Sequence, residues 1–144
     1  MPKSAKMRLD STRIRSLNFK IKKDKEDKGE SAGPSPKNIP INMKLSYGSN
    51  YDYHKKIIFI EIIVSIDQNE LPFMLDIEYE GLFVLDKRVP KKQIKPFCEI
   101  NCPAILFPFL RECIADITRR AGLNPLILPP VNFVELARKK EIPH

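Results

Sequence analysis

Three cysteines and two histidines are the residues of this chain best suited to metal binding or nucleophilic chemistry. The thiols are Cys98, Cys102 and Cys113, and the imidazoles are His54 and His144. A structural zinc site needs four ligands, and this set would require a fourth from a distant histidine or acid. An odd number of cysteines also argues against a disulfide framework. We therefore expect three reduced thiols and no metal or cofactor.

Acidic residues offer a second route to chemistry, because Asp76, Glu78 and Glu80 fall on one face of an extended segment. Paired carboxylates perform acid and base catalysis, but these three alternate with apolar residues, as on the solvated side of a sheet. The chain also lacks a glycine-rich phosphate loop, a nucleophile elbow and an HExxH motif. The sequence therefore predicts no catalytic residue and a protein that is not an enzyme.

The net charge of +7 is concentrated in the first quarter of the chain. Residues 1–37 hold 11 basic and 5 acidic residues, whereas residues 38–144 hold 14 and 13. Phe19 is the one aromatic residue of that basic segment, so base stacking has little support there. We expect a solvated basic segment, and a nucleic-acid-binding protein that uses it is the alternative from another class.

The length of 144 residues fits a single domain over residues 1–144. The longest apolar runs, 57–60 and 104–110, are far shorter than the roughly 20 residues that cross a bilayer. The first ten residues lack the apolar stretch of a secretory signal. We therefore expect a cytoplasmic protein without a membrane span.

Four extended segments and two helices are predicted from the hydrophobic periodicity. The stretch from about residue 22 to 40 combines charges with Gly, Ser and Pro, which is typical of a flexible loop. Before it, Leu17, Phe19 and Ile21 alternate while Ile14 is out of phase, which a β-bulge explains. Period-two patterns follow at 41–47, 57–66 and 71–85, with a bend expected at Gly81.

The period then changes to that of a helix. Apolar residues recur every four positions at Ile105, Phe109, Cys113 and Ile117, and Gly122 stands where a helix should stop. Pro108 must either kink this helix or mark its start. An apolar linker should lie along the body, and the pair Asn132 and Glu135 predicts a short last helix at about 133–140.

The segment CPAILFPFLRECIADITRRAGLNPLILPPVNF closely resembles the carboxyl half of the SecB family of bacterial export chaperones. The pieces CP, LFP, REC and PVNF occur in the order and spacing of that family, and PFMLDIEYEGLF resembles its last strand. The resemblance implies an α+β fold, a four-stranded antiparallel sheet with two carboxyl-terminal helices, and assembly as a dimer of dimers. It also implies binding of unfolded polypeptides without ATP and export through the motor protein SecA.

The resemblance assigns roles to individual residues. Client peptides would contact Phe73 and Phe109, whereas Ala137 replaces a third aromatic residue of the family's groove. The positions that would meet other subunits are Leu75, Ile77, Tyr79, Phe109, Cys113 and Ile117. Met74 and Asp76 match two positions at which the family docks SecA, and Glu78 and Glu80 add negative charge to the same predicted docking surface.

Three features depart from the family's acidic pattern. Ser16 and Lys20 stand where members commonly have acids, and the chain ends in the basic sequence ARKKEIPH. Like charges oppose the docking of a basic partner. The alternative within the family is a SecB-like chaperone dedicated to one client, such as the antitoxin of a toxin–antitoxin pair.

Overall fold

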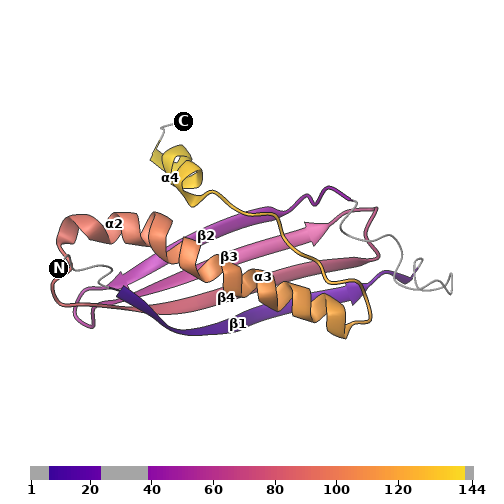
Figure 1. Cartoon of the computed structure of the whole chain (residues 1–144), viewed down its shortest axis with the longest axis horizontal. Helices are drawn as coiled ribbons and strands as arrows, with labels where there is room; N and C mark the ends of the chain where they lie inside the picture. Colours follow the sequence, from indigo (N-terminus) through magenta and orange to yellow (C-terminus); the bar gives the residue numbers. More distant parts are fainter. Residues whose placement is uncertain (1–6, 24–38, 142–144) are drawn as a thin grey trace.

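The computed structural model describes residues 7–23 and 39–141, which form a four-stranded sheet with helices on one face (Figure 1). Most of the loop predicted at about 22–40 lies outside the described residues. The strands are β1 (Met7–Ile21), β2 (Lys44–Asp52), β3 (Ile57–Asp67) and β4 (Phe73–Leu85). The helical segments are η2 (Lys91–Gln93), α2 (Ile94–Pro96), η3 (Phe97–Asn101), α3 (Cys102–Arg120) and α4 (Phe133–Glu141).

The sheet is antiparallel throughout, with the strand order β1-β4-β3-β2. Side chains of the two central strands alternate strictly between a buried face and a partly exposed face. The buried face of β3 carries the even-numbered residues from Ile58 to Ile66, and that of β4 carries the odd-numbered ones from Phe73 to Leu85. The predicted period-two pattern is therefore confirmed, and β1 and β2 are the edge strands.

Strand β1 is irregular in the way the sequence predicts. Its register against β4 shifts between Leu9 and Ser11 and again between Ile14 and Ser16. Each extra residue lets the apolar side chains on both sides of the slip face the helices. The predicted bulge near Ile14 is confirmed.

Helix α3 crosses the buried face of the sheet, with Leu106, Leu110 and Ile114 fully buried. At Gly81 an added Cβ would lie 2.7 Å from Leu106 Cδ1, so the glycine makes room for a side chain of the helix. Strand β4 runs without a break through this position, where the sequence predicted a bend. Pro108 lies inside α3 and does not mark its start.

The segment between α3 and α4 packs along the body, as predicted. Thr118 is fully buried in the last turns of α3, and its Oγ1 accepts a hydrogen bond from Leu126 N at 2.9 Å. Leu128 is also buried, and its carbonyl accepts a hydrogen bond from Arg111 Nε at 3.1 Å. The predicted capping pair is present, because Asn132 Oδ1 accepts a bond from Glu135 N. Among the described residues, no helix has the length and apolarity needed to cross a membrane.

Candidate functional site

The edge strand β1 exposes apolar side chains on the face that carries the helices. Ile14 and Leu17 pair in register with Tyr79 and Ile77, whose side chains lie on the buried face of β4. Paired residues of an antiparallel sheet share a face. The two β1 residues, together with Ile21, nevertheless stay exposed.

One flank of α3 adds to this exposed apolar surface. Cys102 contacts β1 directly, with its thiol 3.1 Å from Met7 Sδ. Phe109 follows Cys102 by seven residues, two helical turns, and therefore lies on the same flank. Phe109 is 45% exposed, and Ile105, one turn before it, is exposed as well. We call this region the β1–α3 surface, which is made of Ile14, Leu17, Ile21, Ile105 and Phe109.

The opposite flank of α3 is covered by the chain itself. Phe107 packs edge-on against Phe133 of α4, with ring centroids 5.9 Å apart. Near the start of α3 this cover leaves an open apolar depression, in which Val134 is exposed. The depression is lined by Ile100, Ala104, Pro130, Val131, Asn132, Phe133 and Val134. The larger exposed apolar groups of α3 therefore lie on the β1 flank.

The two aromatic residues predicted to contact a client lie in different surroundings. Phe109 is on the β1–α3 surface, whereas Phe73 is 0% exposed in the core. Its ring packs on Phe19 with the centroids 5.5 Å apart. Phe73 therefore packs against β1 as part of the core, and its side chain is not accessible to a peptide.

The six residues predicted to contact other subunits also differ in how exposed their side chains are. Leu75, Ile77 and Tyr79 are buried within one chain, because α3 already covers this part of β4. The Tyr79 hydroxyl donates a hydrogen bond to Thr12 Oγ1 at 3.0 Å. Cys113 and Ile117 are partly buried on α3. Of the six residues, Phe109 is the one whose side chain is largely exposed.

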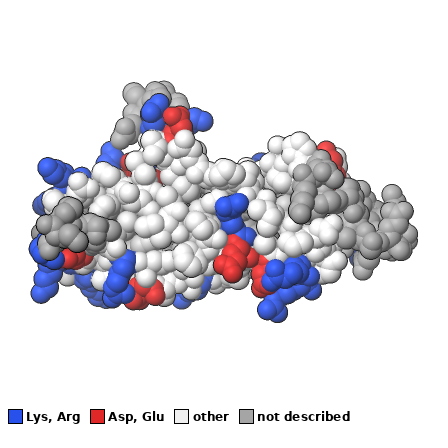
Figure 2. All heavy atoms as spheres, viewed as in Figure 1, with Lys and Arg blue, Asp and Glu red and all other residues white. Residues whose placement is uncertain are grey.

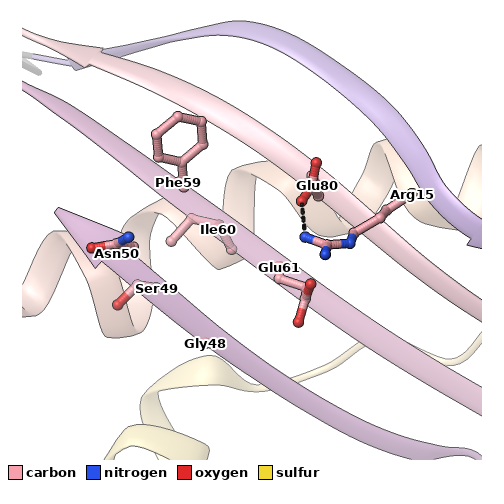
Figure 3. Close-up of a pocket in the computed structure, with 8 residues that line it drawn as sticks. All are labelled: Arg15, Gly48, Ser49, Asn50, Phe59, Ile60, Glu61 and Glu80. Atoms are coloured by element: carbon pink, nitrogen blue, oxygen red, sulfur yellow. Dashed lines mark hydrogen bonds and ion pairs between the residues drawn. The ribbon is translucent and has the colours of Figure 1, made fainter. Parts of the chain in front are cut away.

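The open face of the sheet carries the predicted docking residues Met74, Asp76, Glu78 and Glu80, all of them partly buried. Glu80 accepts a hydrogen bond from Arg13 Nε at 2.6 Å. It accepts a second one from Arg15 Nη1 at 3.3 Å, which Figure 3 shows. The Arg13 bond holds the pKa of Glu80 below its ordinary value of 4.5. Asp76 accepts a hydrogen bond from Ser65 Oγ. Two of the three predicted acids are therefore already engaged within the chain.

Phe59 is the largest apolar group exposed on the open face, and its side chain is 45% exposed. A shallow pocket surrounds it, lined by polar groups of β1, β2 and β4 as well as by Glu61 of its own strand (Figure 3). The residues of this pocket are Arg15, Gly48, Ser49, Asn50, Phe59, Ile60, Glu61 and Glu80.

The residues that first suggested chemistry are buried or far apart. Burial, with a smaller contribution from the nearby Cys98, raises the pKa of the Cys102 thiol to about 12. Burial also raises the pKa of Cys98 and of Cys113, so all three stay protonated thiols near neutral pH. His54 lies exposed in the turn between β2 and β3. Among the described residues, no three His, Cys, Asp or Glu side chains are placed to hold a metal ion.

The exposed positions of β1 were the part of the site that sequence reasoning missed. The alternation of Leu17, Phe19 and Ile21 predicted an apolar face, but not that two of these residues stay uncovered. Their exposure follows from the edge position of β1 and from the path of α3, which are both long-range features. The signal available in the sequence was the combination of apolar residues with a break in their alternation, which is typical of an edge strand.

The sequence of this chain is similar to those of a known protein family. Residues 3–142 match a family described as preprotein translocase subunit SecB. The protein-export protein SecB of Paramagnetospirillum magneticum is 37% identical over 128 residues, which cover 88% of this chain and 80% of that protein. Its counterpart in Bartonella bacilliformis is 32% identical over 106 residues, 74% of this chain and 65% of that protein.

A solved structure has the same fold. It is a SecB-like chaperone of Mycobacterium tuberculosis, in complex with a peptide from an antitoxin. The two chains superpose with a TM-score of 0.62 over 88% of each, at 15% sequence identity. At this identity the likeness establishes the fold alone.

Proposed function

The chain belongs to the SecB family, and from this premise we propose that it is a chaperone that binds unfolded polypeptides without ATP or catalysis. The observation that supports the proposal is the β1–α3 surface, to which β1 and one flank of α3 contribute five exposed large apolar side chains. Apolar surface gathered on one side of a molecule is unfavourable in water and is typical of a binding face. We place this activity in the cytoplasm, as the family resemblance implies.

The β1 edge supplies the second element that an extended client needs. As an edge strand, β1 leaves one row of backbone N–H and C=O groups unpaired within the sheet. An extended segment can satisfy these groups while its apolar side chains contact the surface next to them. Backbone bonds are independent of the client's sequence, so such a surface suits many clients. Phe109 is the aromatic residue we expect to contact them.

We propose that the same surface also serves assembly into a dimer of dimers, which the family resemblance implies. Phe109 lies on the exposed flank of α3, with Cys113 and Ile117 partly buried one and two turns further along the helix. A second copy would cover part of this flank, and clients would cover the rest. The residues Leu75, Ile77 and Tyr79 would then support the interface from within the core.

Delivery of clients to SecA for export is the finer part of the proposal. It would use the open face, where Met74, Asp76, Glu78 and Glu80 lie. This face is only weakly acidic, because Glu80 is held by Arg13 and Arg15, and Lys20 lies beside Met74 in the register. The pairing of Glu80 with two arginines favours the alternative that the chain serves one dedicated client. A binding measurement with purified SecA separates the two, since the alternative predicts no complex.

The experiment that tests the chaperone proposal mixes the purified chain with a destabilised client and follows light scattering without nucleotide. We expect suppression of aggregation at a stoichiometric excess of the chain. Aggregation that proceeds unchanged at this excess would contradict the proposal.

A matched pair of variants tests the assigned surface. Phe109 and Phe59 are both 45% exposed but lie on opposite faces of the sheet. Phe109→Asp should abolish most client binding, because a carboxylate would have to be desolvated against an apolar segment. Phe59→Asp should leave client binding unchanged. Equal losses in the two variants, or normal binding by a folded Phe109→Asp protein, would reject the β1–α3 surface as the client site.

A further inference from the structure

Two segments at one end of the sheet, the β2–β3 turn and the stretch from the end of β4 into η2 and α2, carry half of the basic residues of residues 38–144. Residues 52–56 and 86–95 contain seven basic residues against two acidic ones. The remainder of residues 38–144 contains seven basic and eleven acidic residues, so the near-neutral total conceals a strong separation of charge. Figure 2 shows Lys and Arg atoms gathered toward the left end of the molecule. We call this region the lysine-rich end; its basic residues are Lys55, Lys56, Lys87, Arg88, Lys91, Lys92 and Lys95.

The structure holds the two loops together at the end of the molecule's long axis (Figure 1). The carbonyl of Lys56 accepts a hydrogen bond from Leu85 N at 2.9 Å, which joins the β2–β3 turn to the end of β4. The ammonium groups of Lys56 and Lys91 lie 4.6 and 5.7 Å from the centre of the Tyr53 ring. Cation–π contact therefore orders lysines from both loops around one aromatic side chain.

The backbone of the turn is strained in a way that fixes this arrangement. Lys56 has a φ of 56°, the left-handed conformation that residues other than glycine rarely adopt. Asp52 stabilises the turn, because its Oδ1 accepts a hydrogen bond from Lys55 N at 3.0 Å. A lysine kept in a strained conformation is unusual, since glycine would relieve the strain.

Most of these charges are not neutralised within the chain. Among the described residues, no carboxylate forms an ion pair with Lys55, Lys56, Lys87, Lys91 or Lys92. Arg88 does form an ion pair, at 3.2 Å from Asp86. Most arginines elsewhere in the body pair with acids, as Arg13 does with Glu80 and Arg120 with Asp116. The lysine-rich end is thus positive potential directed toward an external partner.

The type of basic residue indicates which polyanion fits. Arginine recognises a phosphate or carboxylate with fixed, bidentate geometry, whereas lysine acts as a mobile point charge. Six of the seven basic residues are lysines, and the arginine is engaged by Asp86. Tyr53 is 53% exposed among them, and a ring with a polar hydroxyl is favourable at a lipid–water boundary. A lysine ammonium near the ring also competes with base stacking, the usual mode for single-stranded nucleic acid.

We propose that the lysine-rich end binds the phosphate headgroups of an anionic phospholipid bilayer. Clusters of four to eight basic residues attract such membranes electrostatically, without insertion. The binding is reversible and weakens as salt screens the charges. It is independent of client binding, because the β1–α3 surface shares no residue with the lysine-rich end. A chain held by this end would carry its client-binding surface along the membrane.

Vesicle flotation with the full chain tests the proposal. We expect binding to vesicles that contain phosphatidylglycerol, and none to vesicles of phosphatidylcholine alone. The variant with Lys55, Lys56, Lys91 and Lys92 all replaced by Gln should lose about fivefold in affinity for each lysine removed. The double variant Lys91→Gln with Lys92→Gln leaves the strained turn intact and should lose about 25-fold.

A control variant of equal charge change separates this site from net charge. It replaces Arg119, Arg120, Arg138 and Lys139 by Gln, at the ends of α3 and α4. Equal losses in the control and in the four-lysine variant would overturn the proposal, as would absence of binding to the anionic vesicles. The last part of the experiment measures binding of a labelled single-stranded RNA to the same proteins. RNA binding that depends on the four lysines, with no vesicle binding, would assign the end to nucleic acid instead.

Discussion

The two faces of the sheet expose apolar groups of similar size in different surroundings. On the open face Phe59 has Leu82 as its register partner but otherwise lies among mainly polar residues, and the nearby Glu80 is held by two arginines. On the helix face Phe109 belongs to a group of exposed apolar residues on β1 and α3. Both rings are 45% exposed, so exposure alone does not distinguish a binding surface. The neighbours do, because an isolated exposed apolar residue is ordinary, whereas a contiguous group has an occupant.

The largest effect we expect separates the buried part of the helix face from its exposed rim. Leu110→Ala removes a fully buried side chain from the middle of α3 and should lower the free energy of unfolding by about 2–5 kcal/mol. Ile105→Ala, on the exposed flank, should change it by no more than about 0.5 kcal/mol. Urea unfolding of the two variants measures both values. A large loss in Ile105→Ala would mean that the β1–α3 surface is part of the monomer's own core.

The second prediction concerns the linker that covers the other flank of α3. Thr118→Val removes the hydroxyl that accepts the Leu126 N–H and leaves this donor buried without its partner. We expect a loss of about 1–3 kcal/mol in unfolding free energy. Amide hydrogen exchange should show faster exchange at Leu126. Fast amide hydrogen exchange throughout the linker of the unmodified protein would contradict this prediction. It would mean that the linker does not stably cover its flank of α3.

Two neighbouring residues of β1 distinguish the faces in assembly. Leu17 points to the helix face and Asn18 to the open face, where it pairs with Asp76 in register. Leu17→Glu should weaken self-association roughly tenfold or more, because the new charge would be buried between copies. Asn18→Glu should leave the assembly state unchanged. Sedimentation velocity over a range of concentrations gives both answers, and equal shifts would remove the distinction.

The smallest effect we expect is a change in the pKa of Glu80, on the open face of the sheet. Arg13→Gln should raise the pKa of Glu80 toward its ordinary value, because the strongest hydrogen bond to the carboxylate is lost. In the unmodified protein the pKa of Glu80 is depressed, so its contribution to stability is present above about pH 4.5 and is lost as the pH falls through the folded pKa. NMR titration of both proteins tests the shift. An unchanged pKa would contradict the assigned pairing.

Much of the fold could be predicted from local patterns, because alternation along β3 and β4 and the four-residue period of α3 report directly which side chains are buried. The bulge near Ile14 and the cap at Asn132 were equally local. The misplaced features depend on where distant elements meet. The sequence predicts a bend at Gly81, whereas the structure explains the glycine by the close approach of the Leu106 side chain, 25 positions later in the sequence.

The candidate site was harder to predict for the same reason. Periodicity identifies Phe73 and Phe109 alike as apolar, but only the path of α3 decides that Phe73 is covered and Phe109 is not. The pairing of Glu80 with Arg13 joins residues 67 positions apart. The lysine-rich end arises in the same way, since two basic loops that are separate in sequence are brought together by the pairing of β3 with β4.

The close approach at Gly81 has a consequence for how such a chaperone could diversify. An added Cβ at position 81 would lie 2.7 Å from Leu106 Cδ1, so any larger residue there requires the Leu106 side chain to move. Because Leu106 is fully buried, the packing between α3 and the sheet has to absorb this displacement. A substitution at this single position is therefore expected to alter the seating of α3, the helix that carries Phe109.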